Sequence, residues 1–278
     1  MMVQTLALNS GNGLDYGGPS AGGYPLTWWQ LVSQSRKFVI LDSYSTHLKA
    51  DVDNALQAGI AVALFQGYWP QAWSDAAEAT TRANDALSAA KSVNYPKNAV
   101  IWLDCEEMNI TAIQAIDWIN AWSKIVHDAG YEAGVYIGDN CPLNGTQWYE
   151  DLPWVTHYWK SPSQAIPEVA VRGYQLIQES LSQDLNGHSV DFDIATTDQK
   201  GGTPVFMVLS EPNAVSQPVA SPTAASEPLR IYSVVVQSGQ TLESLCQNYG
   251  ARAQDVVQFN QLTSNKVYPG QILKLPVF

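Results

Sequence analysis

Ala99-Val-Ile-Trp-Leu-Asp104-Cys105-Glu106-Glu107 is the stretch of sequence that decides the fold. A short, uninterrupted apolar run that ends in acidic residues is typical of a buried strand. Side chains alternate along a strand, so Asp104 and Glu106 are expected to face one way and Cys105 the other. Two acids on one face are costly in a core unless they open onto a cleft. The segment therefore predicts a pair of carboxyl groups at the edge of a cavity.

Short apolar runs of the same kind recur through the first 209 residues and alternate with helical patterns, which indicates an α/β domain. We expect strands at 14–16, 38–42, 61–65, 100–106, 133–137, 155–159, 173–178 and 190–194, and helices at 26–35, 75–92 and 111–129. Little room for full helices remains between the last three strands. The prediction is an irregular, TIM-like (β/α) barrel with a degenerate final third, whose reactive groups lie at the carboxyl ends of strands. An open doubly wound sheet is the rival architecture.

Glycines near the start do not form a dinucleotide-binding motif. Gly11, Gly13, Gly17 and Gly18 miss the G-x-G-x-x-G spacing, and no strand is expected before them. No cofactor is therefore expected.

Composition narrows the function classes. The 278 residues are 46% hydrophobic and 14% charged, enough apolar material to exclude a wholly disordered or fibrous chain. Fourteen basic residues stand against 26 acidic ones, a net charge of −12, with no basic cluster, which disfavours nucleic-acid binding. Three cysteines do not make a disulfide framework. No apolar run is long enough to span a membrane.

A Pro-, Ser- and Ala-rich stretch at 210–229 divides the chain. It has no hydrophobic period, so it predicts an extended, semi-flexible linker between a domain at 1–209 and a domain at 230–278. All ten Trp residues precede it. The first domain carries 10 basic and 22 acidic side chains, and the last carries 4 and 2.

Further acids end other predicted strands. Asp15 lies on the first and Asp42 closes the second, while Asp191 and Asp193 lie on one face of the last. First and last strands are neighbours in a closed barrel, so Asp15 and Asp191 are expected to meet near the Asp104–Glu106 pair. Acids this close shift each other's pKa values apart, so that one stays protonated while another ionises, as glycosidic bond cleavage requires. Alternatively, each of these acids caps a helix or is an ordinary surface residue.

Three short motifs carry a family resemblance. Gly13-Leu-Asp15-Tyr, Leu103-Asp-Cys-Glu106 and Val190-Asp191-Phe-Asp resemble family 25 glycoside hydrolases, and more closely the glycoside hydrolase-like domains related to that family. That family consists of lysozymes that cut the β-1,4 bond between N-acetylmuramic acid and N-acetylglucosamine, on an irregular barrel. The resemblance implies Glu106 as the general acid and Asp104 as the carboxylate that assists the acetamido group. It implies Asp15 and Asp191 as flanking acids. The Gly/Pro-rich segment after Tyr16 and the second acid, Asp193, depart from the pattern.

Aromatic residues at strand ends are candidates for sugar contacts. Trp69 follows the third predicted strand, Tyr136 ends the fifth and Trp159 ends the sixth. Apolar faces of pyranose rings pack on such side chains, and polar neighbours fix the orientation. Asp42 and Asp193 are expected to bind substrate with them. Packing in the barrel core is the alternative role.

Residues 231–276 resemble a LysM module. The resemblance rests on the segments Tyr232 to Leu245, Tyr249-Gly250, Asp255 to Asn260 and Tyr268 to Pro276. The pattern predicts a small βααβ domain, with strands at 233–236 and 271–275 and a first helix capped near residues 239–241 and stopped at Gly250. A second helix is expected at 253–260. The resemblance implies binding of N-acetylglucosamine polymers between the loops 238–241 and 263–267, at Gly239, Gln240, Thr241 and Asn265. A protein-interaction module is the alternative.

Three functions remain open at this stage. The first is a peptidoglycan glycosidase targeted to the cell wall by LysM, with acid catalysis by Glu106. The second is a non-catalytic protein that binds peptidoglycan or chitin through a degenerate barrel. The third is a cysteine peptidase or amidase that uses Cys105 with His157 or His188. Scattered histidines without H-x-x-x-H or C-x-x-C spacing argue against a metal site.

The expected partner is peptidoglycan or another N-acetylglucosamine-containing glycan, bound by a monomer. Residues 1–13 lack the basic and apolar regions of a signal peptide. We therefore expect synthesis in the cytoplasm and action at the cell wall after release by phage lysis or a secretion machine.

Overall fold

The computed structural model describes residues 2–17, 21–67, 73, 76–210, 230–237, 240–249, 251, 253–260, 262, 267–268 and 270–277. The chain forms two compact units, Met1–Pro212 and Asn213–Phe278. Most of the predicted linker, at 211–229, lies outside the described residues.

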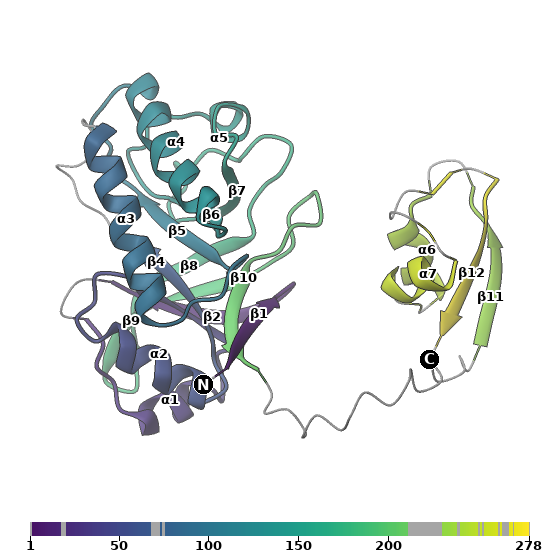
Figure 1. The fold of residues 1–278 in the computed structure, drawn as a ribbon, viewed down its shortest axis with the longest axis horizontal. Coiled ribbons are helices and arrows are strands. Elements are labelled where there is room, and N and C mark those ends of the chain that lie inside the picture. The colour runs from purple at the N-terminus through teal and green to yellow at the C-terminus, as the bar shows by residue number, and fades with distance from the viewer. Residues whose placement is uncertain are drawn as a thin grey trace. The chain divides into compact units, whose positions relative to one another are not determined.

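Eight strands of the first unit close into a barrel (Figure 1). Around the barrel they follow the order β4, β3, β2, β9, β8, β7, β6 and β5, and β5 pairs back to β4. Neighbours are parallel except β9, which is antiparallel to both β2 and β8. The α/β class is confirmed, and the open sheet is wrong because the β4–β5 pairing closes the ring. The strands are β2 (Gly11–Tyr16), β3 (Phe38–Asp42), β4 (Ala61–Gln66), β5 (Val100–Cys105), β6 (Glu132–Ile137), β7 (Val155–Lys160), β8 (Leu176–Leu185) and β9 (His188–Ala195).

Five helices of this unit pack outside the barrel strands in the described residues: α1 (Leu26–Val32), α2 (Leu48–Gln57), α3 (Ala76–Ser92), α4 (Ala112–Asp128) and α5 (Gly145–Glu150). Helices α1, α3 and α4 match predicted ones, whereas α2 and α5 were not predicted. Helix α5 has a recognisable N-cap, because the Asn144 side chain accepts hydrogen bonds from the backbone N–H groups of Thr146 and Gln147. Residues 161–175, all described, contain no helix, and β8 and β9 form a hairpin.

Two strands outside the ring were also not predicted. Strand β10 (Val205–Leu209) pairs antiparallel with β4, and β1 (Val3–Ala7) pairs antiparallel with β10. The Phe206 ring on β10 packs 4.7 Å from the Phe38 ring, centroid to centroid. Residues next to the linker thus complete the barrel core.

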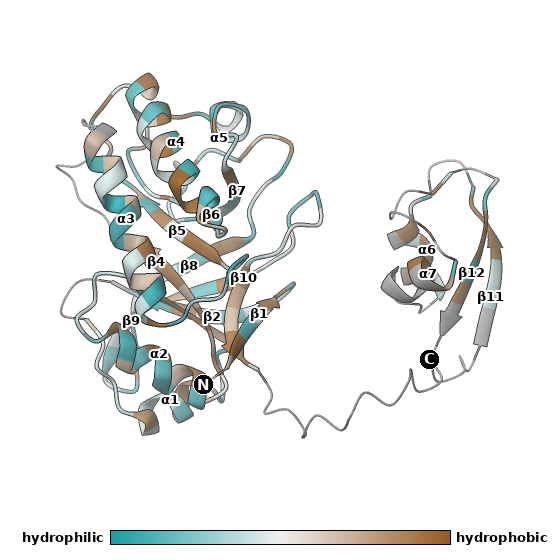
Figure 2. Ribbon diagram, in the orientation of Figure 1, coloured by the Kyte–Doolittle hydropathy of each residue, from teal (hydrophilic) through white to brown (hydrophobic). Residues whose placement is uncertain are grey.

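Alternation along the strands separates two apolar layers, and the apolar strand residues are visible in Figure 2. On β5, Val100 and Trp102 pack in the inner cluster, whereas Ile101 and Leu103 pack in the cluster shared with the helices. Asp104 continues the inner row of β5, and Cys105 belongs to the outer cluster. Asp104 and Cys105 thus point to opposite faces of β5, as predicted.

The second unit has the predicted βααβ order: β11 (Arg230–Val235), α6 (Leu242–Tyr249), α7 (Ala253–Phe259) and β12 (Ile272–Val277). Strands β11 and β12 pair antiparallel. Its own core contains Val236, Leu242, Leu245, Val256 and Leu273. The hydroxyl of Thr241 accepts a 3.1 Å hydrogen bond from the backbone N–H of Ser244 at the start of α6. Gly250, the predicted helix stop, lies outside the described residues.

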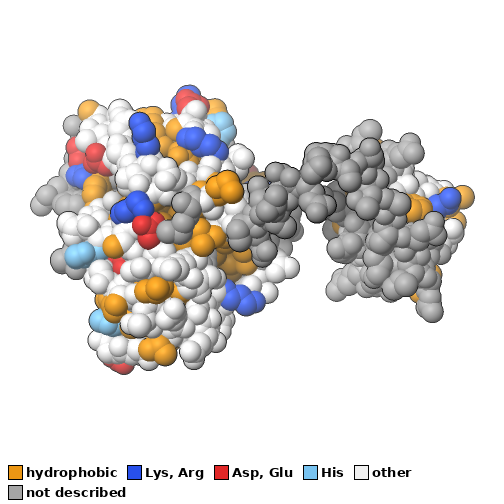
Figure 3. Space-filling view, turned by 60° about the horizontal axis from the view of Figure 1, so that its bottom comes forward, with side chains coloured by type: hydrophobic (Ala, Val, Ile, Leu, Met, Phe, Trp, Pro, Cys, Tyr) orange, Lys and Arg blue, Asp and Glu red, His pale blue; other side chains and the backbone are white. Residues whose placement is uncertain are grey.

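Charged side chains are scattered over the face of the barrel unit seen in Figure 3, with basic and acidic groups interspersed among uncharged surface. In the described part of the chain, no helix has both the length and the apolar character needed to cross a membrane.

Candidate active site

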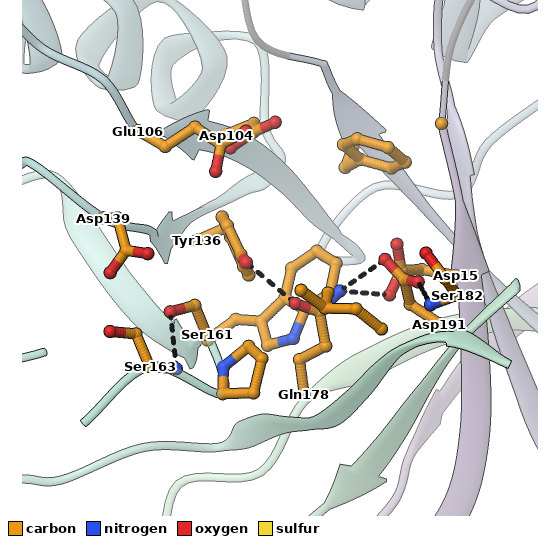
Figure 4. Close-up of a pocket in the computed structure, with 15 residues that line it drawn as sticks. Asp15, Asp104, Glu106, Tyr136, Asp139, Ser161, Ser163, Gln178, Ser182 and Asp191 are labelled. Carbon is orange, nitrogen blue, oxygen red and sulfur yellow. Dashed lines mark hydrogen bonds between the residues drawn. The ribbon is translucent and has the colours of Figure 1, made fainter. Parts of the chain in front are cut away.

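A cavity of about 690 Å³ lies at the carboxyl ends of the parallel strands (Figure 4). Five acidic residues line it, together with aromatic and small polar ones. The described lining consists of Asp15, Gly17, Phe65, Asp104, Glu106, Tyr136, Asp139, Trp159, Ser161, Pro162, Ser163, Gln178, Leu181, Ser182 and Asp191. The four residues predicted to be catalytic are thus brought together, and none of the described lining residues is basic.

One wall carries the predicted acid pair. Asp104 ends the inner row of β5 and is 8% exposed, and Glu106 is half-buried just beyond the strand. Burial is the main cause that raises the pKa of Glu106, and the nearby charges of Glu107, Asp139 and Asp191 raise it further. Glu106 is therefore suited to carry a proton at a pH where ordinary surface glutamates are ionised.

The opposite wall is built by the pairing of β2 with β9. Asp15 and Asp191 are direct partners in that antiparallel pair, as expected from the closure of the barrel. Burial and the Asp191 charge raise the pKa of Asp15 to about 7. Asp191 is half-buried, which raises its pKa, while its Oδ1 accepts a 2.6 Å hydrogen bond from the backbone N–H of Ser182.

Gln178 joins the two acids of this wall, as the dashed lines of Figure 4 show. Its Nε2 group donates to Oδ2 of Asp15 at 2.8 Å and to Oδ2 of Asp191 at 3.2 Å. The Tyr136 hydroxyl donates to Gln178 Oε1 at 2.8 Å. A tyrosine donor on the amide oxygen fixes the orientation of the amide, so its N–H groups face the carboxyls.

Trp159 and Tyr136 form the inner end of the cavity. Their rings lie 4.6 Å apart in an edge-to-face arrangement, and Trp159 also packs near Phe65 and Trp102. Trp159 is 2% exposed and donates its indole N–H to Oδ1 of Asp193 at 2.9 Å. Both predicted aromatics line the cavity, but both are also core residues, so each combines the two roles weighed from the sequence.

Other predicted substrate-binding residues have different surroundings. Asp42 is not among the described lining residues, and its Oδ1 accepts hydrogen bonds from the backbone N–H groups of Tyr44 and Gly67. Asp193 is fully buried below the cavity surface. Trp69 lies outside the described residues.

In the second unit, Gly239 and Asn265 lie outside the described residues. The Gln240 side chain accepts a 2.8 Å hydrogen bond from the backbone N–H of Gln237. Gln240 therefore holds the backbone just after β11, and Thr241 caps the start of α6.

Sequence reasoning missed several lining residues. Gln178 was placed on a predicted strand but not in the site, and Asp139 follows β6 without a motif to mark it. Between Gln178 and Gln183 the β8–β9 register shifts twice. This irregularity leaves Leu181 51% exposed at the cavity rim. It also points the backbone N–H of Ser182 at Asp191. An irregular register of this kind leaves no sequence signal.

The cysteine–histidine arrangement is not formed. Cys105 packs in the outer layer, and burial raises the pKa of its thiol. His157 lies against the inner Trp102 and hydrogen-bonds Thr156 Oγ1 and the carbonyl of Thr203, and its burial lowers its pKa to about 4. His188 packs on Tyr24.

Within the described residues, no group of three or more His, Cys, Asp or Glu side chains is arranged to hold a metal ion. The acids of the cavity instead act on one another: the Glu106 charge raises the pKa of Asp15, and Asp191 raises that of Glu106. This arrangement suits proton transfer between carboxyl groups and a neutral, hydroxyl-rich ligand.

Comparison of the sequence with known protein families identifies the family to which the chain belongs. The sequence profile described as "Rv2525c-like, glycoside hydrolase-like domain" matches residues 45–195, which are 151 of the 278 residues. The chain belongs to this family. Its second unit matches the LysM domain over residues 234–276. This Rv2525c-like, glycoside hydrolase-like protein therefore joins a hydrolase-type barrel to a LysM domain, as the motifs indicated. No curated protein matches the chain.

Two solved structures show the fold of the Rv2525c-like barrel. An uncharacterized B. stearothermophilus protein has a TM-score of 0.52 and 16% identity, with 66% of this chain and 95% of that one covered. The Tat-secreted protein Rv2525c of Mycobacterium tuberculosis, in complex with L-tartrate, has a TM-score of 0.50 and 15% identity, with 67% and 96% covered. At these identities the similarity concerns the fold.

Proposed function

We propose that the protein is a peptidoglycan hydrolase of the N-acetylmuramidase type, which cleaves the β-1,4 glycan backbone while LysM holds it on the wall. The observation that carries the proposal is the cavity at the carboxyl strand ends, where Glu106 is partly desolvated beside Asp104 and faces the acids of β2 and β9. A cavity of about 690 Å³ has room for a sugar residue and its neighbours.

Glu106 is the proposed general acid. Its raised pKa keeps a proton available for the leaving glycosidic oxygen, and a matched pKa is what makes acid catalysis effective. Asp104, on the same inner row of β5, is the proposed carboxylate that assists the acetamido group. Asp191 and Asp15 supply negative charge on the opposite side, where it stabilises an oxocarbenium-like transition state.

LysM is the proposed wall anchor. Its match covers residues 234–276, and this unit has its own core. A binding module tethered to a catalytic domain raises the local concentration of substrate without any new contact at the active site. Synthesis in the cytoplasm and release by phage lysis or a secretion machine would bring the protein to this substrate.

Glu106→Gln tests the proposal on purified sacculi. The variant should bind sacculi normally and release at least 100-fold fewer reducing ends, measured by mass spectrometry of the soluble muropeptides. Glu150→Gln is the matched control, because Glu150 is exposed on α5 and does not line the cavity. Binding of wild-type protein without release of muropeptides would instead support a non-catalytic wall-binding protein.

A further inference from the structure

Asp193 is the one acid of the β2–β9 wall that does not line the cavity. It is 0% exposed, and its Oδ1 accepts the indole N–H of Trp159. An indole only donates, so this contact leaves the other oxygen of Asp193 to be satisfied. That buried oxygen, Oδ2, has no partner among described hydrogen-bond donors, and the Asp193 carboxyl lies in hydrogen-bonding contact with that of Asp15.

Two carboxyl groups in contact need a proton between them. Asp15, 5% exposed, reaches the cavity and receives Gln178 Nε2 on its Oδ2, whereas Asp193 is sealed from water. Ionising the sealed member costs more than ionising the one at the cavity edge. The proton therefore belongs on Asp193.

Two hydrogen-bonded chains then converge on Asp15. One runs from Trp159 through Asp193, and the other runs from Tyr136 through Gln178. Each chain points a donor at a carboxylate oxygen of Asp15.

We propose that Asp193 is a positioning residue that stays uncharged and donates its carboxyl proton to Asp15, which orients the Asp15 carboxylate once Asp15 ionises. Held in this way, Asp15 accepts hydrogen bonds from substrate hydroxyl or acetamido N–H groups. This role of Asp15 in turnover rests on the proposed function, whereas the location of the proton does not.

Other charged groups face the pair. Asp191 on β9 and Glu106 beyond β5 oppose ionisation of Asp15, and the Arg36 guanidinium lies close enough to feel the charge of Asp193. Burial is the largest cause that raises the pKa of Asp193 well above its ordinary value, and the Asp15 charge adds to it. Burial and the Asp15 charge thus favour a proton on Asp193, against the attraction of Arg36 for the ionised form.

The location of the proton is tested by ¹³C NMR of the full chain labelled at the aspartate carboxyl carbons. Loss of a signal in Asp15→Asn and Asp193→Asn assigns the two groups. The Asp193 signal should keep the shift of a protonated acid up to pH 8, while Asp15 becomes ionised within that range. An Asp193 signal that moves to the carboxylate position below pH 8 would overturn the proposal.

The positioning role is tested by turnover of sacculi. Asp193→Asn keeps an acceptor for Trp159 and a donor for Asp15, so kcat should stay within threefold of wild type with the same pH profile. Asp193→Ala and Asp15→Asn should each lose at least tenfold. An Asp193→Asn variant as inactive as Asp15→Asn would overturn the role. A wild-type chain with the predicted NMR titration but no turnover would refute the proposed function and leave the proton assignment intact.

Discussion

Gly138 leaves the space in which the Glu106 side chain lies. A Cβ atom built at position 138 would come 2.5 Å from Cβ of Glu106 and 2.9 Å from its Oε2. The backbone N–H of Gly138 donates to the carbonyl of Cys105, so the loop after β6 is fixed against the end of β5. The position of the proposed acid thus depends on the absence of a side chain on the neighbouring strand end.

Gly138→Ala should displace Glu106 and lower the release of reducing ends at least tenfold. Overpacking of this kind typically costs about 1–3 kcal/mol of stability. Urea unfolding of Gly138→Ala, Glu106→Gly and the double variant measures the coupling between the positions. The destabilisation caused by Gly138→Ala should shrink in the Glu106→Gly background, and equal destabilisation in both backgrounds would contradict the steric account.

Tyr136→Phe removes the donor that orients the Gln178 amide. We expect a three- to tenfold loss of turnover together with a stability loss of about 1 kcal/mol, the usual net value of a buried hydrogen bond. Tyr95→Phe is the matched control, because the Tyr95 hydroxyl donates to the carbonyl of Val100 at 2.7 Å away from the cavity lining. Its stability loss should be similar, with turnover unchanged. Equal turnover in Tyr136→Phe and Tyr95→Phe would show that the Tyr136 hydroxyl does not orient Gln178 for catalysis.

The acids on the two walls of the cavity could be predicted from the sequence, whereas the Gln178 hydrogen bonds that link Asp15 and Asp191 could not. Asp104 and Glu106 were placed because side chains alternate along an apolar strand, and Asp15 was placed opposite Asp191 because a closed barrel joins its first and last strands. Gln178 is brought to these acids by the pairing of β8 with β9, in which it is the partner of Asp193, and local sequence does not specify that pairing.

Strand β10, whose Phe206 ring packs in the barrel core, was not predicted for a related reason. Residues 205–209 form an apolar run beside the linker, and their role as β10 follows from the tertiary contact of Phe206 with Phe38 rather than from their own pattern. The N-cap residue of helix α2 is His47, which makes no side-chain capping hydrogen bond, so the start of the helix carries no sequence signal.

The contribution of Asp15 to stability should fall as the pH rises through the acidic range, while the lowered pKa of His157 acts in the opposite direction. The pKa of Asp15 is raised from 3.8 to about 7 by folding, so the native state binds more protons than the unfolded chain between pH 4 and 7. The part of the free energy of unfolding that comes from Asp15 therefore decreases across that window and levels off above it, and it is on the order of 2–4 kcal/mol.

Urea unfolding at several pH values checks this dependence. The difference in the free energy of unfolding between wild type and Asp15→Asn should decrease between pH 4 and 7, whereas the difference between wild type and Asp117→Asn, at an exposed position on α4, should not change with pH. Wild-type and Asp15→Asn profiles with the same slope over this window would show that Asp15 ionises normally in the folded protein.

Leu181 should contribute to substrate binding rather than to chemistry. Its side chain is 51% exposed at the rim of the cavity, where the apolar face of a sugar ring would cover it. Burial of about 40 Å² of apolar surface at about 25 cal/mol per Å² is worth about 1 kcal/mol, or about a fivefold change in affinity. Leu181→Ser should therefore raise KM about fivefold on soluble glycan fragments and leave kcat within twofold.

Ile113→Ser provides the comparison, because Ile113 on α4 is 72% exposed and does not line the cavity. Its KM should equal that of wild type. Soluble fragments are the right substrate, since binding of intact sacculi through LysM would mask a change at the barrel. A drop in kcat for Leu181→Ser at unchanged KM would mean that the β8 irregularity acts through Asp191, which accepts the backbone N–H of the adjacent Ser182, and not through direct contact with the sugar.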